Sequence, residues 1–332
     1  MTTRLTELVE PLPDGRLRCG VCQWCCSLGD GEVGRCLVRT HTGGGIAVTN
    51  HGLVSAANVG PVEEHRLWHF FPGTPVLSIG GWGYAFPADQ QRGQYGRVPE
   101  EGQRRRELDP ERVASVALDK LCRGVVWSYS DPSVAHEYVL DLLRTCRANS
   151  RYTALVTSGY ATLAALDQLG HYLDGISLDL RAFEDGAYRR LTGADEWRGI
   201  LEVAAHARRR WGVHIEVTTR LHPGVNDTPE QLAGLAGWIL ETLGPHTPWH
   251  VLPGDAGSAA AAAVARARRA GHEAGLLFVY GPEAGQATAC SACSATVIDR
   301  SGGVVKAAGL DGGRCAACGE ELHIRTSIFK RH

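Results

Sequence analysis

The sequence predicts an α/β protein with a parallel sheet, open or closed into a barrel, and a cysteine-rich segment at each end. Across the middle of the chain, short apolar runs alternate with amphipathic stretches, and strands that alternate with helices form parallel sheets. Nine of the eleven cysteines lie in two groups near the ends, and only Cys122 and Cys146 lie between them. Both isolated cysteines are expected to be buried structural thiols.

Seven apolar runs predict strands, and six amphipathic stretches predict helices. The strands are expected at Pro75–Ile79, Gly124–Trp127, Thr153–Thr157, Gly175–Leu180, His214–Thr219, Trp249–Leu252 and Leu276–Tyr280. The helices are expected at Pro110–Leu121, Ser133–Ala148, Tyr160–Leu169, Trp197–Trp211, Thr228–Leu243 and Ser258–Gly275. Ser133 and Thr228 are expected N-caps, and Gln231 stands where a capping box needs it. The polar stretch from Ala88 to Arg112 is expected to be a mobile, solvated loop.

The composition is that of an ordinary soluble globular protein, with 44% hydrophobic and 21% charged residues. The formal net charge of −2 predicts no nucleic-acid partner, and no apolar run is long enough to span a membrane. The first residues are polar and lack the apolar core of a signal peptide, so a cytoplasmic location is expected. Cysteines stay reduced there, which favours metal ligation or buried thiols over disulfides.

The carboxy-terminal cysteines have the spacing of a zinc ribbon. Two CxxC knuckles flank a β-like segment at Ala295–Ala308. Each knuckle presents two thiolates from one tight turn, which predicts a tetrahedral structural site with zinc as the expected metal. Its ligands are Cys290, Cys293, Cys315 and Cys318. Iron in the same cage, two disulfides and free thiols are the alternatives. Gly319 is expected to have a positive φ in the turn after the last cysteine.

The amino-terminal run RCGVCQWCCSLGDGEVGRCLVR predicts a second four-cysteine site. The expected ligands, again of zinc, are Cys19, Cys22, Cys26 and Cys36. Cys25 is the alternative to Cys26, and the spacing from Cys19 through Cys22 to Cys25 also begins ferredoxin cluster motifs. An iron–sulfur cluster and a metal-free segment are therefore the alternatives at this end of the chain.

Polar residues follow most of the expected strands. In parallel folds the carboxyl ends of the strands meet at one rim, where ligands bind. The polar residues are Asp131, Thr157, Ser158, Tyr160, Asp179, Arg181, Glu216, Thr218, His222, Asn226, Asp227 and His250. Each one alone is equally well a helix cap or a turn residue, but together they predict a ligand pocket.

The order of these motifs resembles the radical-SAM proteins of the AmmeMemoRadiSam system, relatives of the pyruvate formate-lyase activating enzymes. The resemblance extends over nearly the whole chain. It rests on GRCLVR at Gly34–Arg39, RLWHFFPGTPVLSIG at Arg66–Gly80, YSDPSVAHEY at Tyr129–Tyr138, VTSGY at Val156–Tyr160, SLDLRAF at Ser177–Phe183, EVTTRLHPGVND at Glu216–Asp227, PWH at Pro248–His250 and the ribbon. It implies a radical-SAM-type (β/α) partial barrel at residues 66–285, a cysteine-rich metal-binding segment at residues 1–65 and a rubredoxin-like zinc ribbon at residues 286–332.

The sequence departs from this family at the cluster loop. The family places three cysteines, spaced CxxxCxxC, after the first strand; they ligate three irons of a [4Fe–4S] cluster, and SAM chelates the fourth. This chain has Tyr84, Ala88 and Gln91 at those positions, and no cysteine lies between Cys36 and Cys122. These side chains cannot supply the three thiolates. No [4Fe–4S] cluster and no reductive cleavage of SAM are therefore expected.

The SAM motifs of the family are otherwise largely retained. The residues that the resemblance implies for SAM binding are Asp131, Ser158, Gly159, Asp179, Arg181 and His250. Asp131 stands where an acidic residue takes the methionyl amino group, although aspartate is one methylene shorter than the family's glutamate. Asp179 and Arg181 stand near the methionyl carboxylate, where arginine keeps the charge of the family's lysine but changes its geometry.

Two functions follow from this pattern. The first is polar, non-radical chemistry on SAM and an unknown small-molecule substrate: methyl or aminocarboxypropyl transfer, or cyclisation or elimination on the methionyl arm. The candidate bases are Tyr84, Asp89, Glu216, His222 and His250. Trp82, Tyr84 and Phe86 are expected either to form an aromatic wall for the sulfonium or to fill the space of the lost cluster. The second function is an inactive pseudoenzyme that serves a protein partner as scaffold or regulatory subunit. The retained charged residues favour the first.

Overall fold

The computed structural model describes residues 4–92, 95–96, 98–99, 105–254, 256–283 and 285–328. The chain forms two compact units that alternate along the sequence. The first comprises residues 1–60, 76–174 and 192–211, and the second comprises residues 61–75, 175–191 and 212–332. The sequence-based boundaries at residues 65 and 285 stay a prediction. Among the described helices, none combines the length and apolarity needed to cross a membrane.

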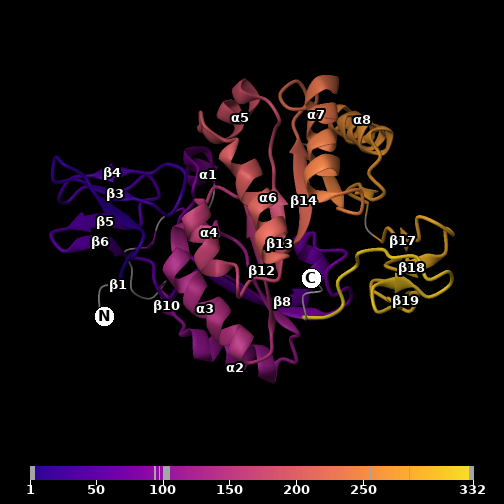
Figure 1. The fold of residues 1–332 in the computed structure, drawn as a ribbon, viewed down its shortest axis with the longest axis horizontal. Helices are drawn as coiled ribbons and strands as arrows, with labels where there is room; N and C mark the ends of the chain where they lie inside the picture. Colours follow the sequence, from indigo (N-terminus) through magenta and orange to yellow (C-terminus); the bar gives the residue numbers. More distant parts are fainter. Residues whose placement is uncertain are drawn as a thin grey trace. The chain divides into compact units, whose positions relative to one another are not determined.

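The first unit begins with two small antiparallel sheets that carry the amino-terminal cysteines (Figure 1). One sheet has the order β1 (Arg4–Leu5), β6 (Gly45–Val48), β5 (Arg39–Thr42), and the other has the order β2 (Val9–Pro11), β3 (Leu17–Cys19), β4 (Ser27–Leu28). Cys19, Val21, Leu28 and Ile46 are buried together with Ala165 of a later helix. The cysteine segment therefore shares an apolar core with the helical layer of its own unit.

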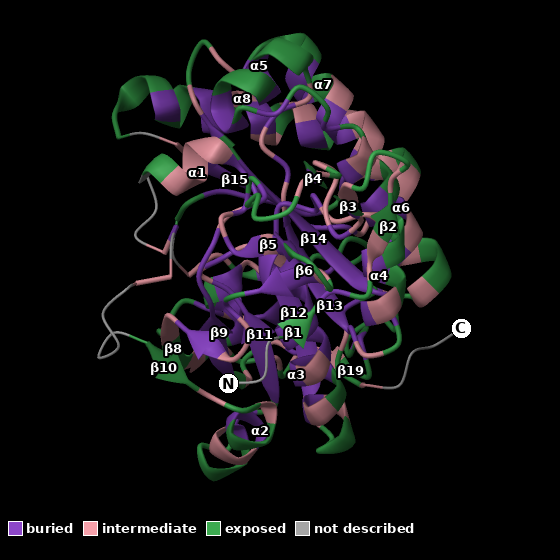
Figure 2. Cartoon of the chain, turned by 90° about the vertical axis from the view of Figure 1, so that its left-hand side faces the viewer, coloured by how far each residue is buried: buried purple, intermediate pink, exposed green. Residues whose placement is uncertain are grey.

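The parallel strands of the first unit lie in the order β12 (Tyr152–Thr157), β11 (Gly124–Trp127), β9 (Pro75–Gly80), with β8 (Ala56–Pro61) next to β9. The helices of this unit are α1 (Pro87–Arg92), α2 (Pro110–Asp119), α3 (His136–Ala148), α4 (Leu163–Leu169) and α6 (Gly199–Trp211). Figure 2 shows β9, β11 and β12 buried, whereas α2 exposes one side. Burial on both faces explains why these strands are nearly continuous apolar runs.

The second unit has its own parallel strands, in the order β13 (Gly175–Asp179), β14 (His214–Leu221), β15 (Trp249–Pro253), β16 (Val279–Tyr280). Its helices are the 3₁₀ turn η1 (Val62–His65), α5 (Asp185–Thr192), α7 (Pro229–Trp238) and α8 (Ser258–Ala274). Helices α7 and α8 pack side by side (Figure 1). The register aligns Asp179, Thr218, His250 and Tyr280 across the four strands.

The carboxy-terminal ribbon belongs to the second unit and consists of two antiparallel pairs. These are β17 (Thr288–Ala289) with β18 (Thr296–Ile298), and β19 (Leu310–Asp311) with β20 (Arg314–Cys315). Its apolar residues Val297, Ile298 and Leu322 are buried together with Trp68 and Tyr280 of the same unit.

The expected strands form, with ends that differ by at most two residues, except that only Val279–Tyr280 of the last run is a strand. The prediction of Ser133 as an N-cap is wrong. Asp131 is the cap of the 3₁₀ turn η3 (Pro132–Ala135), which leads into α3; the cap lies two residues earlier than expected because Pro132 takes the first position of the turn. Thr228 caps α7 as expected and accepts a hydrogen bond from the Gln231 backbone N–H. The same helix changes to a π-helical turn, η4 (Ile239–Leu243).

The polar stretch from Ala88 to Arg112 is not a loop throughout. It contains most of α1, then β10 (Arg106–Glu107), which pairs with β7 (Leu53–Val54), and the start of α2. The expectation of a solvated loop is wrong for these elements. Residues 93, 94, 97 and 100–104 lie outside the described part of the chain.

Candidate functional site

Asp131 lies after β11 and joins two loops of the first unit. One carboxylate oxygen accepts hydrogen bonds from the Ser133 backbone N–H at 3.0 Å and from the Ser133 hydroxyl at 2.6 Å. The other accepts from the backbone N–H of Ser158 at 3.0 Å and from its hydroxyl. A carboxylate has about four lone-pair sites, so all of them have a donor here. An incoming ammonium group would have to displace a serine hydroxyl.

Ser158 and Gly159 form the loop that follows β12. Gly159 has φ of 73°, a conformation that glycine adopts without a side-chain penalty. Its backbone N–H donates to the Thr157 hydroxyl at 3.0 Å. Ser158, Gly159 and the next residue, Tyr160, are buried. The structure therefore brings together Asp131, Ser158 and Gly159, three of the residues expected to bind SAM.

Tyr84 stands at the first of the three cluster positions. Its hydroxyl donates to the Tyr129 carbonyl oxygen at 3.2 Å. Burial, followed by the nearby Asp89 carboxylate, raises the pKa of Tyr84 above its ordinary value. The phenol is therefore neutral at physiological pH, so it offers a hydrogen bond and is not available as a base.

The three expected aromatic residues of this loop do not share one environment. Trp82 is buried with its ring 5.8 Å from that of Tyr95. Phe86 is fully buried and packs against Tyr160, with ring centroids 4.8 Å apart. Phe86 therefore fills core volume, and Trp82 packs beside Tyr95, a contact that was not expected.

The amino-terminal cysteines form a loose cluster. Burial raises the pKa of the Cys22 thiol well above its ordinary value, and the neighbouring Cys36, Cys19 and Cys26 raise it further. Cys25 is exposed and has φ of 43°; its thiol donates to the Cys22 carbonyl oxygen at 3.5 Å, and its neighbours include Arg18, Cys26 and Glu10. Within the described residues, the only group whose ligand atoms converge to within 4.8 Å of one another is at the other end of the chain.

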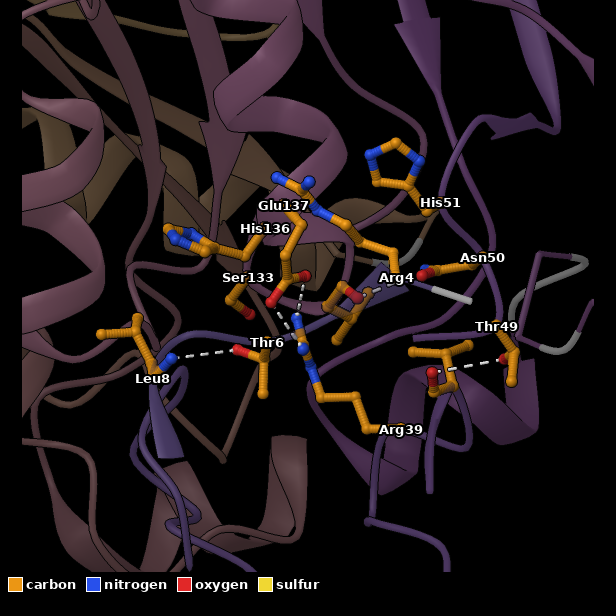
Figure 3. A network of polar contacts seen from close by, with 12 residues as sticks. Arg4, Thr6, Leu8, Arg39, Thr49, Asn50, His51, Ser133, His136 and Glu137 are labelled. Carbon is orange, nitrogen blue, oxygen red and sulfur yellow. Dashed lines mark hydrogen bonds and ion pairs between the residues drawn. The ribbon is translucent and has the colours of Figure 1, made fainter. Parts of the chain in front are cut away.

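A buried ion pair joins the cysteine segment to α3. Arg39, three residues after Cys36, donates to both carboxylate oxygens of Glu137 at 2.8 and 2.7 Å (Figure 3). Arg39 is 2% exposed and Glu137 is 5% exposed. Although burial opposes ionisation, the Arg39 guanidinium holds the pKa of Glu137 at about 2. The Asn50 amide donates nearby to the Trp82 and Val134 carbonyl oxygens at 2.8 and 3.2 Å.

In the second unit, polar residues follow β13 and β14. Asp179 and Arg181 pair with one another, with Arg181 Nε 3.0 Å from an Asp179 carboxylate oxygen. The Asn226 amide donates to the Arg181 carbonyl oxygen at 2.6 Å and so connects the two strand ends. His222 follows β14 directly, and its backbone N–H donates to the Asn226 side-chain oxygen at 2.7 Å. The imidazole of His222 packs against Gly254, where a Cβ would meet it at 2.4 Å.

Glu216 and His250 lie near the amino ends of their strands and are fully buried. Glu216 accepts four hydrogen bonds: from His214 Nε2 at 3.0 Å, from His250 Nε2 at 2.8 Å, and from the backbone N–H groups of Trp68 and His69 at 3.0 and 2.7 Å. Although burial opposes its ionisation, these donors hold the pKa of Glu216 below its ordinary value. Burial lowers the pKa of His250, so the imidazole donates in its neutral form. This arrangement gives both side chains an architectural role.

The carboxy-terminal cysteines converge closely. The Sγ atoms of Cys290 and Cys318 are 3.6 Å apart, and those of Cys293 and Cys315 are 3.7 Å apart. A tetrahedral shell with metal–sulfur bonds of about 2.3 Å has sulfur–sulfur edges of about 3.8 Å. The distances therefore fit a four-thiolate metal site. A hydrogen bond from the Cys318 backbone N–H lowers the pKa of the Cys315 thiol to about 7, which favours the thiolate that a metal needs.

The two knuckles have the same backbone form. Ser294 N–H donates to the Cys290 carbonyl oxygen at 2.9 Å, and Gly319 N–H donates to that of Cys315 at 2.8 Å. Both donors have positive φ, 62° for Ser294 and 80° for Gly319, which confirms the expectation for Gly319. Each turn thus directs two thiols to one point.

The sequence profile of the radical SAM superfamily matches residues 87–236. The chain carries a radical SAM domain. A Methanocaldococcus jannaschii protein described as uncharacterized is 29% identical over 330 residues, which cover 95% of this chain and 97% of that protein. The isethionate sulfite-lyase activating enzyme of Oleidesulfovibrio alaskensis is 30% identical over 119 residues, or 36% of this chain and 38% of the enzyme.

The pyruvate formate-lyase-activating enzyme of Clostridium pasteurianum is 26% identical over 122 residues, which cover 37% of this chain and 50% of the enzyme. The chain thus matches these activating enzymes over half of their length or less. Among solved structures, a radical SAM methyltransferase from Sphaerobacter thermophilus is 14% identical over 72% of each chain, with a TM-score of 0.49. The identities with the two activating enzymes show that the matched part of this chain is homologous to part of those enzymes.

Sequence reasoning missed several residues around the radical SAM domain. His69, Tyr280 and Arg300 belong to one buried hydrogen-bond network. His69 Nε2 is 2.8 Å from the Tyr280 hydroxyl, which also contacts the Thr288 hydroxyl. Arg300 donates to Thr288 at 2.9 Å and to the Trp68 carbonyl oxygen at 2.7 Å. Gln23, in the cysteine run, was also missed. Each of these residues is polar within an otherwise apolar or cysteine-rich stretch of sequence. A polar residue in such a stretch is expected to be buried and hydrogen-bonded, and this pattern could have identified them.

Proposed function

We propose that this protein binds SAM with its radical SAM domain and uses it in polar chemistry, without a [4Fe–4S] cluster. The observation that carries the proposal is the composition of the cluster loop. Tyr84, Ala88 and Gln91 occupy the positions of the three ligating cysteines, and no cysteine lies between Cys36 and Cys122. A site-differentiated cluster needs three thiolates at this place, so the reductive cleavage of SAM has no electron donor here.

The proposed SAM contacts are those that the resemblance gives. Asp131, Ser158 and Gly159 would hold the methionyl amino group once a serine hydroxyl has moved away from the Asp131 carboxylate. Asp179 and Arg181 would lie toward the methionyl carboxylate. His250 is fully buried against Glu216, so its role would be indirect, through the strand that carries it.

When bound, SAM supplies a sulfonium with three electrophilic carbons, and polar attack on them needs positioning and a base. Among the candidate bases, His222 lies at the carboxyl end of β14, is partly exposed, and is our first choice. Tyr84 stays protonated because burial raises its pKa, so it offers a hydrogen bond and is not available as a base. Glu216 is committed to four internal donors. The sulfur-containing product of SAM would show which group is transferred.

An inactive pseudoenzyme is the second candidate. One observation favours it: the charged groups of the proposed site already satisfy one another. Asp131 has donors at both oxygens, and Asp179 is paired with Arg181. In this case the chain would act as a scaffold or regulatory subunit for a protein partner.

Titration with SAM separates the two functions. Under the first, calorimetry of metal-replete protein shows saturable binding, and Asp131→Asn weakens it by more than tenfold because a charge-assisted contact is lost. Formation of S-adenosylhomocysteine or of methylthioadenosine on incubation with SAM identifies the carbon that is attacked. Absence of SAM binding at millimolar concentration, with the fold intact, supports the pseudoenzyme. A visible absorption band of a [4Fe–4S] cluster in anaerobically purified protein would disprove the cluster-free proposal.

We also propose zinc in the carboxy-terminal site and, through Cys19, Cys22, Cys26 and Cys36, in the amino-terminal site. All eleven cysteines are free thiols, which supports metal ligation in a reducing compartment such as the cytoplasm. The ordered motifs from GRCLVR to the ribbon support a place among the radical-SAM proteins of the AmmeMemoRadiSam system. Elemental analysis gives two zinc ions per chain if both proposals hold.

A further inference from the structure

Residues 20–23, the cysteine loop of the first unit, contact residues 159–162, which follow β12. The Gln23 amide donates to the Ala161 carbonyl oxygen at 3.0 Å and to that of Gly159 at 3.4 Å. The Gln23 backbone N–H donates to the Tyr160 carbonyl oxygen at 3.0 Å, and Cys22 forms an antiparallel bridge with Ala161. These bonds begin one residue after Ser158.

Two further bonds continue this contact. The Thr162 hydroxyl donates to the Gly20 carbonyl oxygen at 2.6 Å, and its backbone N–H donates to that of Val21 at 3.0 Å. Thr162 is at the same time the N-cap of α4, where it accepts from the Ala165 backbone N–H. The cysteine loop is thus bonded to the whole segment between Ser158 and the start of α4.

The next residue of the cysteine run reaches a different loop. Trp24 Nε1 donates to the Ala85 carbonyl oxygen at 2.7 Å, beside Tyr84 in the cluster-position loop. Gln90 of that loop donates back to the Arg35 carbonyl oxygen at 2.6 Å, and the Arg35 guanidinium lies 4.5 Å from the centre of the Trp24 ring. Neighbouring residues of one short loop therefore hold two different loops.

We propose that Gln23 and Trp24 are positioning residues for the ligand loops of the first unit. Gln23 fixes the Ser158–Gly159 loop, and Trp24 fixes the loop at Tyr84–Ala85. Neither side chain is among the proposed ligand contacts: Gln23 bonds the carbonyl oxygens of Gly159 and Ala161, and Trp24 bonds that of Ala85, next to Tyr84. The amino-terminal cysteine segment then contributes to the ligand site by holding its loops in position.

The close fit around Gln23 supports this role. A Cβ at Gly199, at the start of α6, would lie 2.6 Å from the Gln23 amide oxygen. The absence of a side chain at Gly199 leaves room for the amide, so α6 holds Gln23 against the loop after β12. Cys22 precedes Gln23 directly, and a metal on the cysteine cluster would restrict the same loop.

This inference rests on the proposed SAM site, but its first test needs no ligand. Gln23→Met keeps the length of the side chain and removes both amide donors, while Trp24→Phe keeps an aromatic ring and removes Nε1. Hydrogen exchange is measured on the ligand-free, metal-replete full chain. We expect about tenfold faster exchange at residues 157–162 in Gln23→Met and at residues 82–90 in Trp24→Phe, since each loses net hydrogen bonds of ordinary strength. Arg18→Gln, which breaks an exposed ion pair with Glu10 in the same amino-terminal segment, is the control and leaves both segments unchanged.

The second measurement is the SAM dissociation constant, which we expect to rise about tenfold in Gln23→Met and to be unchanged in Arg18→Gln. Unchanged exchange in both Gln23→Met and Trp24→Phe overturns the positioning role, and so does a uniform increase over the whole chain. If the wild-type chain binds no SAM while the two local exchange patterns appear, the proposed function fails and the support of the loops stands. If only one of the two variants folds, the presence or absence of its expected local increase in hydrogen exchange supports or overturns the positioning role.

Discussion

At the scale of single residues, the pair of Arg39 and Glu137 shows how a buried charge is tolerated. Each oxygen of the carboxylate has its own guanidinium N–H donor, and both side chains are almost fully buried. Two-point hydrogen bonding of this kind is the geometry that offsets the cost of removing two charges from water. The same pair fixes the strand that follows Cys36 against the start of α3.

Replacing Glu137 with Gln should lower the free energy of unfolding by about 3 kcal/mol at neutral pH, because a buried guanidinium loses its charged partner. The pKa of Glu137 is lowered to about 2 in the folded state, so its contribution is present above the unfolded pKa of about 4.5 and is lost as the pH falls toward 2. Urea unfolding of both proteins across this range should therefore show the difference shrinking as the pH decreases.

Arg16→Gln is the matched control, because Arg16 and Glu32 form an ion pair at 2.6 Å on the surface of the same unit. Exposed pairs contribute about 1 kcal/mol or less. An equal loss of unfolding free energy in Glu137→Gln and Arg16→Gln would mean that the buried pair of Arg39 and Glu137 stabilises the fold no more than an exposed pair does.

The four thiols of the ribbon permit a direct test of metal ligation. Cys318→Ser should remove one zinc ion per chain, because a hydroxyl is a poor ligand for a four-thiolate site. The ribbon should then become sensitive to proteolysis, since metal binding to such sites supplies much of their folding free energy. Elemental analysis measures the loss, and Cys146→Ser, at an isolated buried thiol, should retain full metal content. Retention of both zinc ions in Cys318→Ser would exclude this cysteine as a ligand.

At the scale of elements, capping shows where local sequence decides the structure. Thr228→Ala should lower the free energy of unfolding by about 1 kcal/mol, because the Gln231 backbone N–H loses its acceptor at the start of α7. Thr228→Ser keeps that acceptor and should cost only a few tenths of a kcal/mol. Denaturant unfolding compares the two, and equal losses would show that packing, rather than capping, explains the effect.

The parallel strands were predictable because burial on both faces leaves apolar runs that local composition reveals. Gly124–Trp127 is an example in which the expected and observed ends agree. The short strands of the cysteine segment were not predictable, since two to four residues carry no periodic signal and their pairing depends on the packing of Val21 and Ile46. The cap at Asp131 was missed although its contact is local, because Pro132 begins the 3₁₀ turn before the serine that was expected to cap the helix.

At the scale of the whole molecule, the candidate site was predictable in its residue types and less so in their roles. The resemblance drew attention to Asp131 and Ser158, and the structure brings them into contact. It could not indicate that Glu216 and His250 form a hydrogen bond in the interior. Both residues lie within strands, and the sequence does not show how deeply a polar side chain of a strand is buried. The convergence of the ribbon cysteines was predictable because their spacing alone determines the geometry.

Under the proposed function, the absence of cluster chemistry rests on three side chains, Tyr84, Ala88 and Gln91. If the radical SAM domain otherwise retains the loop geometry, the triple variant Tyr84→Cys, Ala88→Cys and Gln91→Cys should acquire a [4Fe–4S] cluster on anaerobic reconstitution, because three thiolates then stand at the required spacing. Ala88 and Gln91 lie three residues apart on α1, and Tyr84 precedes that helix in the same loop. Iron and sulfide analysis with the visible spectrum measures the gain. The double variant Ala88→Cys and Gln91→Cys is the control and should gain no stable cluster, since two thiolates leave the site one ligand short. A triple variant that folds and binds no iron would show that the loop itself, and not only its three side chains, has moved away from cluster binding.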